Sequence, residues 1–106
     1  MRQSNAYKYG VQGEEIASDY LQEIGFEILS CRFKTKYGEI DLVAKKDDLL
    51  IFVEVKSRNA PMHLELINKT KIDRSCNAAS AFLAENPHYS EYQMRFDLII
   101  IINGEI

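Results

Sequence analysis

Residues 49–58 begin as an apolar run rich in β-branched residues and carry three charged side chains, Glu54, Lys56 and Arg58, in their second half. Such a run is typical of a β-strand. Side chains alternate between the two faces of a strand, so Glu54 and Lys56 share a face, and Arg58 follows them. A lone charge on a buried face is costly. These charges in an apolar strand therefore need a structural or a chemical explanation.

The apolar pattern predicts five further elements. Helical spacing predicts helices over 13–25, ending at Gly25, and over 69–84, where Ile72, Cys76, Ala79, Phe82 and Leu83 form one face. Strands are expected over 26–33, 39–44 and 95–102, and no regular element is assigned to residues 59–68. The strands over 39–44 and 49–58 should form an antiparallel pair across a polar hairpin. The order α-β-β-β-α-β predicts an α/β fold with a central mixed sheet packed between helices.

The length of 106 residues fits a single domain spanning residues 1–106. With 46% apolar and 27% charged residues, the composition is that of a folded protein. The sequence has no apolar run of 18 residues and no apolar signal stretch near its start, so a cytoplasmic location and no membrane partner are expected. Cys31 and Cys76 have no CxxC spacing, and we expect them to be reduced and buried.

The net charge of −3 disfavours nucleic-acid binding through bulk charge. The charge is unevenly distributed, however. Residues 1–27 and 85–106 each sum to −3, whereas residues 28–84 hold ten basic and seven acidic side chains. The middle of the chain can therefore face a phosphate backbone.

Three carboxylates and a lysine are candidates for phosphodiester chemistry. The antiparallel hairpin would bring Asp41 beside Glu54 and Lys56. Carboxylate oxygens are natural ligands of Mg²⁺, and a nearby lysine can orient a water or stabilise charge that develops at phosphorus. Glu14, in the first turns of the first helix, is a third acid that could join them.

These residues also carry a resemblance. Gly13-Glu14, residues 38–42 (Gly-Glu-Ile-Asp-Leu), residues 52–58 (Phe-Val-Glu-Val-Lys-Ser-Arg) and residues 95–97 (Arg-Phe-Asp) occur in this order. The sequence resembles the YraN family of predicted endonucleases, which is similar to Holliday-junction resolvases of the restriction-endonuclease-like PD-(D/E)XK superfamily. The resemblance implies the restriction-endonuclease-like fold, with a mixed sheet flanked by helices.

The resemblance also implies roles for individual residues. Asp41 and Glu54 would bind Mg²⁺ or Mn²⁺, Lys56 would be the catalytic lysine, and Glu14 would support the metal or its water. Backbone phosphate contacts would come from Arg58, Lys71 and Arg95. The implied partner is a nucleic acid, with DNA expected and branched or structured DNA favoured, and the implied assembly is a homodimer.

Other interpretations stay open at this point. Glu54 and Lys56 could form an ordinary surface ion pair, and Glu14 could simply favour the start of its helix. A catalytically silent nucleic-acid-binding module of the same fold is the main alternative to an endonuclease. A protein–protein interaction role without nucleic acid is a third reading. The two histidines and two cysteines lack the spacing of a zinc site.

Overall fold

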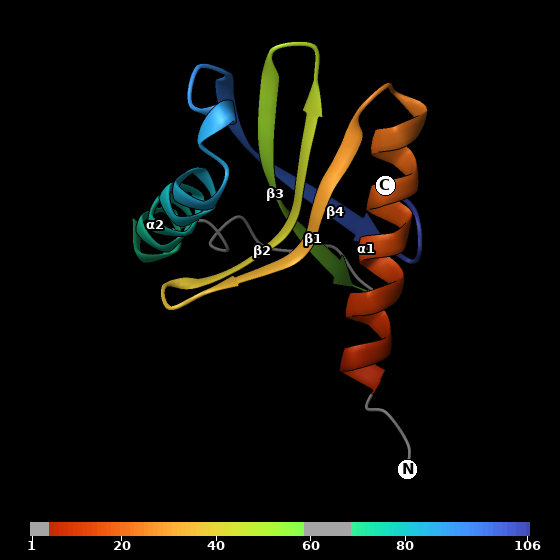
Figure 1. The fold of residues 1–106 in the computed structure, drawn as a ribbon. Helices are drawn as coiled ribbons and strands as arrows, with labels where there is room; N and C mark the ends of the chain where they lie inside the picture. Colours follow the sequence, from red (N-terminus) through yellow and green to blue (C-terminus); the bar gives the residue numbers. More distant parts are fainter. Residues whose placement is uncertain (1–4, 59–68) are drawn as a thin grey trace.

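The computed structural model describes residues 5–58 and 69–106 (Figure 1). Its elements in chain order are α1 (Asn5–Glu23), β1 (Glu27–Thr35), β2 (Gly38–Lys46), β3 (Leu49–Arg58), α2 (Lys69–Glu85), the 3₁₀ helix η2 (Pro87–Tyr89) and β4 (Gln93–Ile102). The predicted order of helices and strands is confirmed. Within the described ranges, no helix has the length and apolar character needed to cross a membrane.

The four strands form one mixed sheet in the order β1-β2-β3-β4. β2 pairs with β3 in antiparallel fashion, as the polar hairpin predicted, and β1 also pairs with β2 in antiparallel fashion. β4 pairs with β3 in parallel, from Leu49 opposite Gln93 to Arg58 opposite Ile102. The connection through α2 makes this parallel pairing possible, since parallel neighbours need a crossover.

A helix packs on each face of the sheet (Figure 1). Alternation along β3 supplies both cores, because Ile51 and Val53 face α1 whereas Leu50 and Phe52 face α2. The α1 side also buries Ala17, Leu21, Phe26, Leu42, Ala44, Ile99 and Ile101. The α2 side also buries Ile40, Val43, Ala78, Ala79 and Phe82.

The chain turns at Gly25, directly after α1. Gly25 has a φ of +101°, in the left-handed region that glycine adopts readily. Its N–H donates to the carbonyl of Gln22, and the N–H of Phe26 donates to the carbonyl of Leu21. These bonds satisfy carbonyls of the last turn, so the predicted stop is confirmed.

Three side chains that were expected to be buried are exposed. Ile72 is 51% exposed, and Cys76 is also exposed, because the buried stripe of α2 begins only at Ala78. The first two turns of this helix lie beyond the core. Cys31 is exposed because β1 is an edge strand, so the prediction of two buried cysteines is wrong.

The sheet splits between β2 and β3. Their backbone pairing ends at Leu42 opposite Val53, although β2 extends back to Gly38 and β3 continues to Arg58. Beyond that pair, β2 stays with β1 and β3 stays with β4, so the two ribbons diverge (Figure 1). The predicted acids Asp41 and Glu54 lie at the first position beyond the last backbone pair.

Candidate active site

Asp41 bridges the split through its side chain. Its Oδ2 accepts a hydrogen bond from the backbone N–H of Val55 at 2.8 Å. Continued pairing would have supplied this N–H with a backbone partner on β2, so the carboxylate replaces part of the missing ladder. Asp41 therefore lies close to the part of β3 that carries Glu54, as expected. The contact is made by the Asp41 side chain to the β3 backbone, whereas a regular hairpin would have continued the backbone pairing.

Glu54 forms ion pairs with two lysines from different elements. Its Oε1 lies 3.0 Å from Nζ of Lys56 on β3 and 3.2 Å from Nζ of Lys71 on α2. The shared face predicted for Glu54 and Lys56 is confirmed. Lys71 was singled out only as a phosphate contact, but here it also reaches the acid, so one carboxylate and two ammonium groups converge at this end of β3.

Glu54 has a lowered pKa despite partial burial. Burial alone would raise the pKa of this carboxyl, but the hydrogen bond and charge of Lys56, followed by those of Lys71, outweigh it and lower the pKa below its ordinary 4.5. Glu54 is therefore held as a carboxylate, which is the form that binds a cation.

Asp41 shifts in the opposite direction. Burial is the main cause that raises its pKa above the ordinary 3.8, and the N–H of Val55 opposes this effect. The negative charges of Glu14, then Glu54, then Glu39 raise the pKa further. Two neighbouring carboxyls with oppositely shifted pKa values are characteristic of sites that bind cations or transfer protons.

Glu14 reaches the site from α1 and is held by Arg32. Nε of Arg32 lies 2.7 Å from Oε1 of Glu14, and the carboxylate is only 17% exposed. Arg32 has a φ of +55°, which is uncommon for a residue with a side chain. Such backbone strain often occurs at functional sites.

The sequence interpretation missed Arg32. A signal was available, because the short turn after Thr35 sets the hairpin register, and counting back from Thr35 opposite Gly38 places Arg32 across from Asp41. The paired neighbours, Cys31 with Leu42 and Phe33 with Ile40, confirm that placement.

A close helix–strand approach brings Glu14 to this end of the sheet. A Cβ on the neighbouring Gly13 would lie 3.1 Å from Cβ of Ser57 and 3.6 Å from Cδ1 of Ile101. The absence of a side chain at Gly13 thus lets α1 lie tightly against β3 and β4. Gly13 therefore allows the close packing of α1, and this packing brings the adjacent Glu14 to the site.

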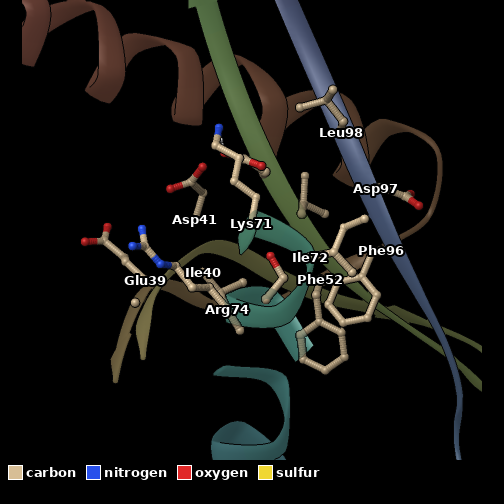
Figure 2. A pocket seen from close by; sticks show the side chains of 14 residues that line it. Glu39, Ile40, Asp41, Phe52, Lys71, Ile72, Arg74, Phe96, Asp97 and Leu98 are labelled. Atoms are coloured by element: carbon tan, nitrogen blue, oxygen red, sulfur yellow. Dashed lines mark hydrogen bonds and ion pairs between the residues drawn. The ribbon is translucent and has the colours of Figure 1, made fainter. Parts of the chain in front are cut away.

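The other predicted phosphate contacts are placed differently. The side chain of Arg58 lies outside the described residues. Arg95 forms a two-pronged pair with Asp97, with Nε to Oδ1 at 2.7 Å and Nη2 to Oδ2 at 2.9 Å. Alternation along β4 puts both on the face opposite Phe96, and in Figure 2 the carboxylate of Asp97 lies on the other side of the strand from the Phe96 ring. Arg95 is thus not brought to the acid group.

A cavity of about 500 Å³ opens beside Asp41 and Glu54. It is lined by residues 38–41 of β2, 52–54 of β3 and 96–98 of β4, and by Lys71, Ile72, Arg74 and Ser75 of α2 (Figure 2). Arg74, which the sequence interpretation did not single out, adds a second α2 cation to its lining. The split in the sheet and the exposed turns of α2 together form this concave surface.

The donor set fits a magnesium-type cation better than zinc. Within residues 5–58 and 69–106, no cluster of three or more His, Cys, Asp or Glu side chains could hold a metal ion by itself. Structural zinc sites need such clusters, whereas Mg²⁺ is commonly held by one or two carboxylates together with waters and substrate phosphate. Oδ1 of Asp41 and Oε2 of Glu54 are the carboxylate oxygens not used in the contacts described above.

Residues 13–101 match the family described as "Uncharacterised protein family UPF0102". The chain belongs to the UPF0102 family. A UPF0102 protein from Rhodopseudomonas palustris is 42% identical over 97 residues, covering 91% of this chain and 75% of the relative. One from Mesorhizobium japonicum is 39% identical over 98 residues, covering 92% and 78% respectively. One from Bartonella tribocorum is 40% identical over 102 residues, covering 95% and 78%.

The UPF0102 match spans the whole candidate site, from Glu14 on α1 to the lining residues of β4. Neither the family description nor the names of these relatives states an activity. The chemistry of this UPF0102 protein therefore has to be inferred from its own side chains.

Proposed function

We propose that this protein is a metal-dependent endonuclease that hydrolyses phosphodiester bonds in DNA, with branched or structured DNA as the favoured substrate. The observation that carries the proposal is the meeting of Asp41, Glu54 and Lys56 where the sheet splits. The YraN-like endonuclease resemblance of the sequence points to the same three residues.

Asp41 and Glu54 would hold Mg²⁺ or Mn²⁺ through their carboxylate oxygens. When bound, the cation supplies Lewis-acid polarisation of the scissile phosphate and lowers the pKa of a bound water. The lowered pKa of Glu54 keeps one ligand ionised. Asp41, with its raised pKa, holds its proton to a higher pH than an ordinary Asp, so the cation would compete with that proton in acid.

Lys56 is positioned by Glu54, 3.0 Å away on the same face of β3. Its ammonium group can orient the attacking water and stabilise the negative charge that develops on the phosphate oxygens. Its side chain is only 24% exposed, so water screens this charge less than it would at a surface. Lys71 and Arg74 carry positive charge along the cavity and can meet the adjoining backbone phosphates.

A purely structural ion pair between Glu54 and Lys56 does not account for the other acids at this site. A structural Glu54–Lys56 pair needs no second carboxylate whose pKa is raised by burial and by three neighbouring acids. The negative charges of Glu14 and Glu54 disfavour ionisation of Asp41, and a bound cation would relieve that cost. Sites of this kind are retained for function at the expense of stability.

The proposal is tested by a cleavage screen with Mg²⁺ and with Mn²⁺, using single-stranded, duplex, flap and four-way-junction DNA and a matched RNA strand. Wild type should cut at least one DNA substrate, and Lys56→Gln should lower the rate by roughly 10²- to 10⁴-fold. Lys45→Gln, at the opposite end of β2, is the matched control and should cut normally. Binding without cleavage by any metal-loaded sample would instead indicate a silent binding module.

A further inference from the structure

The cavity beside Asp41 and Glu54 has one charged wall, which these acids and Lys71 form, and a second wall that is apolar and aromatic. Phe52, Ile72 and Phe96 line it on the side away from Asp41 (Figure 2). Phe96 is 47% exposed and Ile72 is 51% exposed, although both are large apolar side chains. Apolar side chains gathered in a concavity beside a polar site are typical of ligand pockets.

The ring of Phe96 is supported on one face by the ring of Phe52. Its ring stacks on that of Phe52, with centroids 5.4 Å apart and an angle of 30° between the planes. Phe52 is 2% exposed, and it meets Phe82 edge to face at 5.9 Å. The exposed ring of Phe96 therefore rests on a buried aromatic group, and a planar ligand would find it preorganised.

The charged and aromatic walls meet at neighbouring strand positions. In the parallel register, Phe52 lies opposite Phe96 and Glu54 lies opposite Leu98, with all four side chains on the α2 face. Lys71 and Ile72 are adjacent on α2 and line the two walls. One ligand that carries both a phosphate and a planar apolar group would satisfy both walls.

We infer that the Phe96–Ile72 wall binds an unpaired nucleobase while the adjoining phosphate lies at Asp41, Glu54 and Lys56. This inference rests on the proposed function and names its substrate class: a strand with an unstacked base next to the scissile phosphate. In a regular duplex, the bases are stacked and paired, so their faces are not offered to a protein side chain. Aromatic groups bind the faces of unpaired bases with little dependence on sequence.

The inference is tested by binding to three otherwise identical DNA duplexes in EDTA, which removes the cation that cleavage would need. One carries a single unpaired adenine, one carries an abasic residue at that position, and one is fully paired. Fluorescence anisotropy gives the dissociation constants. Wild type should bind the unpaired adenine most tightly, and Phe96→Ala should lose that preference by roughly 5- to 150-fold, the range expected for one stacked base.

Two further variants control for folding and for general apolar contact. Phe96→Tyr should keep the preference, because it preserves the ring. Met94→Ala should also keep it, since Met94 is 40% exposed on the same strand and face but does not line the cavity. Equal binding of the adenine and abasic duplexes by wild type, or an unchanged preference in Phe96→Ala, would overturn the inference.

The two proposals fail in different ways. Cleavage by wild type without any effect of the unpaired base leaves the nuclease standing and removes the base pocket. Base-dependent binding without cleavage in the metal screen would support the base pocket and contradict the nuclease proposal. Light scattering adds a further outcome: if Phe96→Ala changes only the oligomeric state, the aromatic wall is a contact between two copies of the chain and the inference is wrong.

Discussion

The carboxylate of Asp41 binds the backbone N–H of Val55 just beyond the point where β2 and β3 stop pairing. A site residue thus also satisfies a main-chain donor that the split would otherwise leave without its ladder partner. This dual role fixes one oxygen of Asp41 against β3 and directs the charge of the group into the split. Substitution of Asp41 can remove its negative charge and keep the hydrogen bond to Val55, so the two effects can be measured separately.

Asp41→Asn should raise the stability of the protein without metal, because asparagine keeps an acceptor for Val55 and removes the repelled charge. The folded-state pKa of Asp41 is raised, so its favourable contribution is present below the unfolded pKa and is lost as pH rises through the folded value. At neutral pH the ionised group therefore costs stability. The melting temperature in EDTA should increase by a few degrees, at about 4–8 °C per kcal/mol.

Added Mn²⁺ should reverse this order, since a ligand that binds only the folded state stabilises it. Wild type should gain stability with Mn²⁺, and calorimetric titration should detect binding that Asp41→Asn lacks. Glu39→Gln is the control, because Glu39 is exposed and raises the pKa of Asp41 less than Glu14 or Glu54 does. A lower melting temperature for Asp41→Asn in EDTA would mean that the carboxylate is mainly structural.

Glu14→Gln should lower the pKa of Asp41 towards its ordinary range. Glu14 is the largest charge effect that raises this pKa, ahead of Glu54 and Glu39. Carboxyl-carbon NMR titration of Asp41 measures the change directly and does not require activity. In wild type the midpoint should lie above 3.8, and it should move down more in Glu14→Gln than in Glu39→Gln. Identical shifts in the two variants would contradict the placement of Glu14 beside Asp41.

Lys56→Gln should reduce the acid sensitivity of folding. The pKa of Glu54 is lowered on folding, so its favourable contribution is present above the unfolded pKa and is lost as pH falls through the folded value. Urea unfolding at a series of pH values near and below 4.5 should show a steep loss of stability in wild type. The loss should be shallower in Lys56→Gln and intermediate in Lys71→Gln. Equal slopes in all three proteins would show that neither lysine holds the charge of Glu54.

Arg32 can be examined with a pair of substitutions that remove the same side chain. Arg32→Gly and Arg32→Ala both delete the contact with Glu14, but only glycine adopts the φ of +55° without strain. The left-handed conformation costs about 1–2 kcal/mol for a residue with a Cβ. Arg32→Gly should therefore be the more stable of the two in chemical denaturation, despite the greater flexibility of unfolded glycine. The opposite order would indicate that β1 relaxes at this position.

Local patterns were sufficient to predict much of the fold. The apolar run of β3 predicted both its bounds, Leu49–Arg58, and the shared face of Glu54 and Lys56. The polar hairpin predicted the antiparallel pairing of β2 with β3. These features depend on alternation and turn chemistry, which act over a few residues.

Longer-range geometry could not be read in the same way. Helical spacing placed Ile72 in the core, but burial depends on how far α2 extends past the sheet. The pairing of Lys71 with Glu54 and of Arg32 with Glu14 joins residues 17 and 18 positions apart on different elements. By contrast, the Arg95–Asp97 pair lies two positions apart on one strand, so alternation alone would have predicted it.

The parallel pairing of β3 with β4 also bears on when the protein becomes competent during its synthesis. The cavity needs residues 38–41 and also residues 96–98, which β4 contributes late in the chain. A chain emerging from the ribosome can form the β1–β2–β3 meander before that strand is available, but it cannot complete the pocket. Long-range pairing of this kind forms late in folding. The topology therefore delays completion of the cavity, and with it of the proposed site, until β4 has emerged from the ribosome.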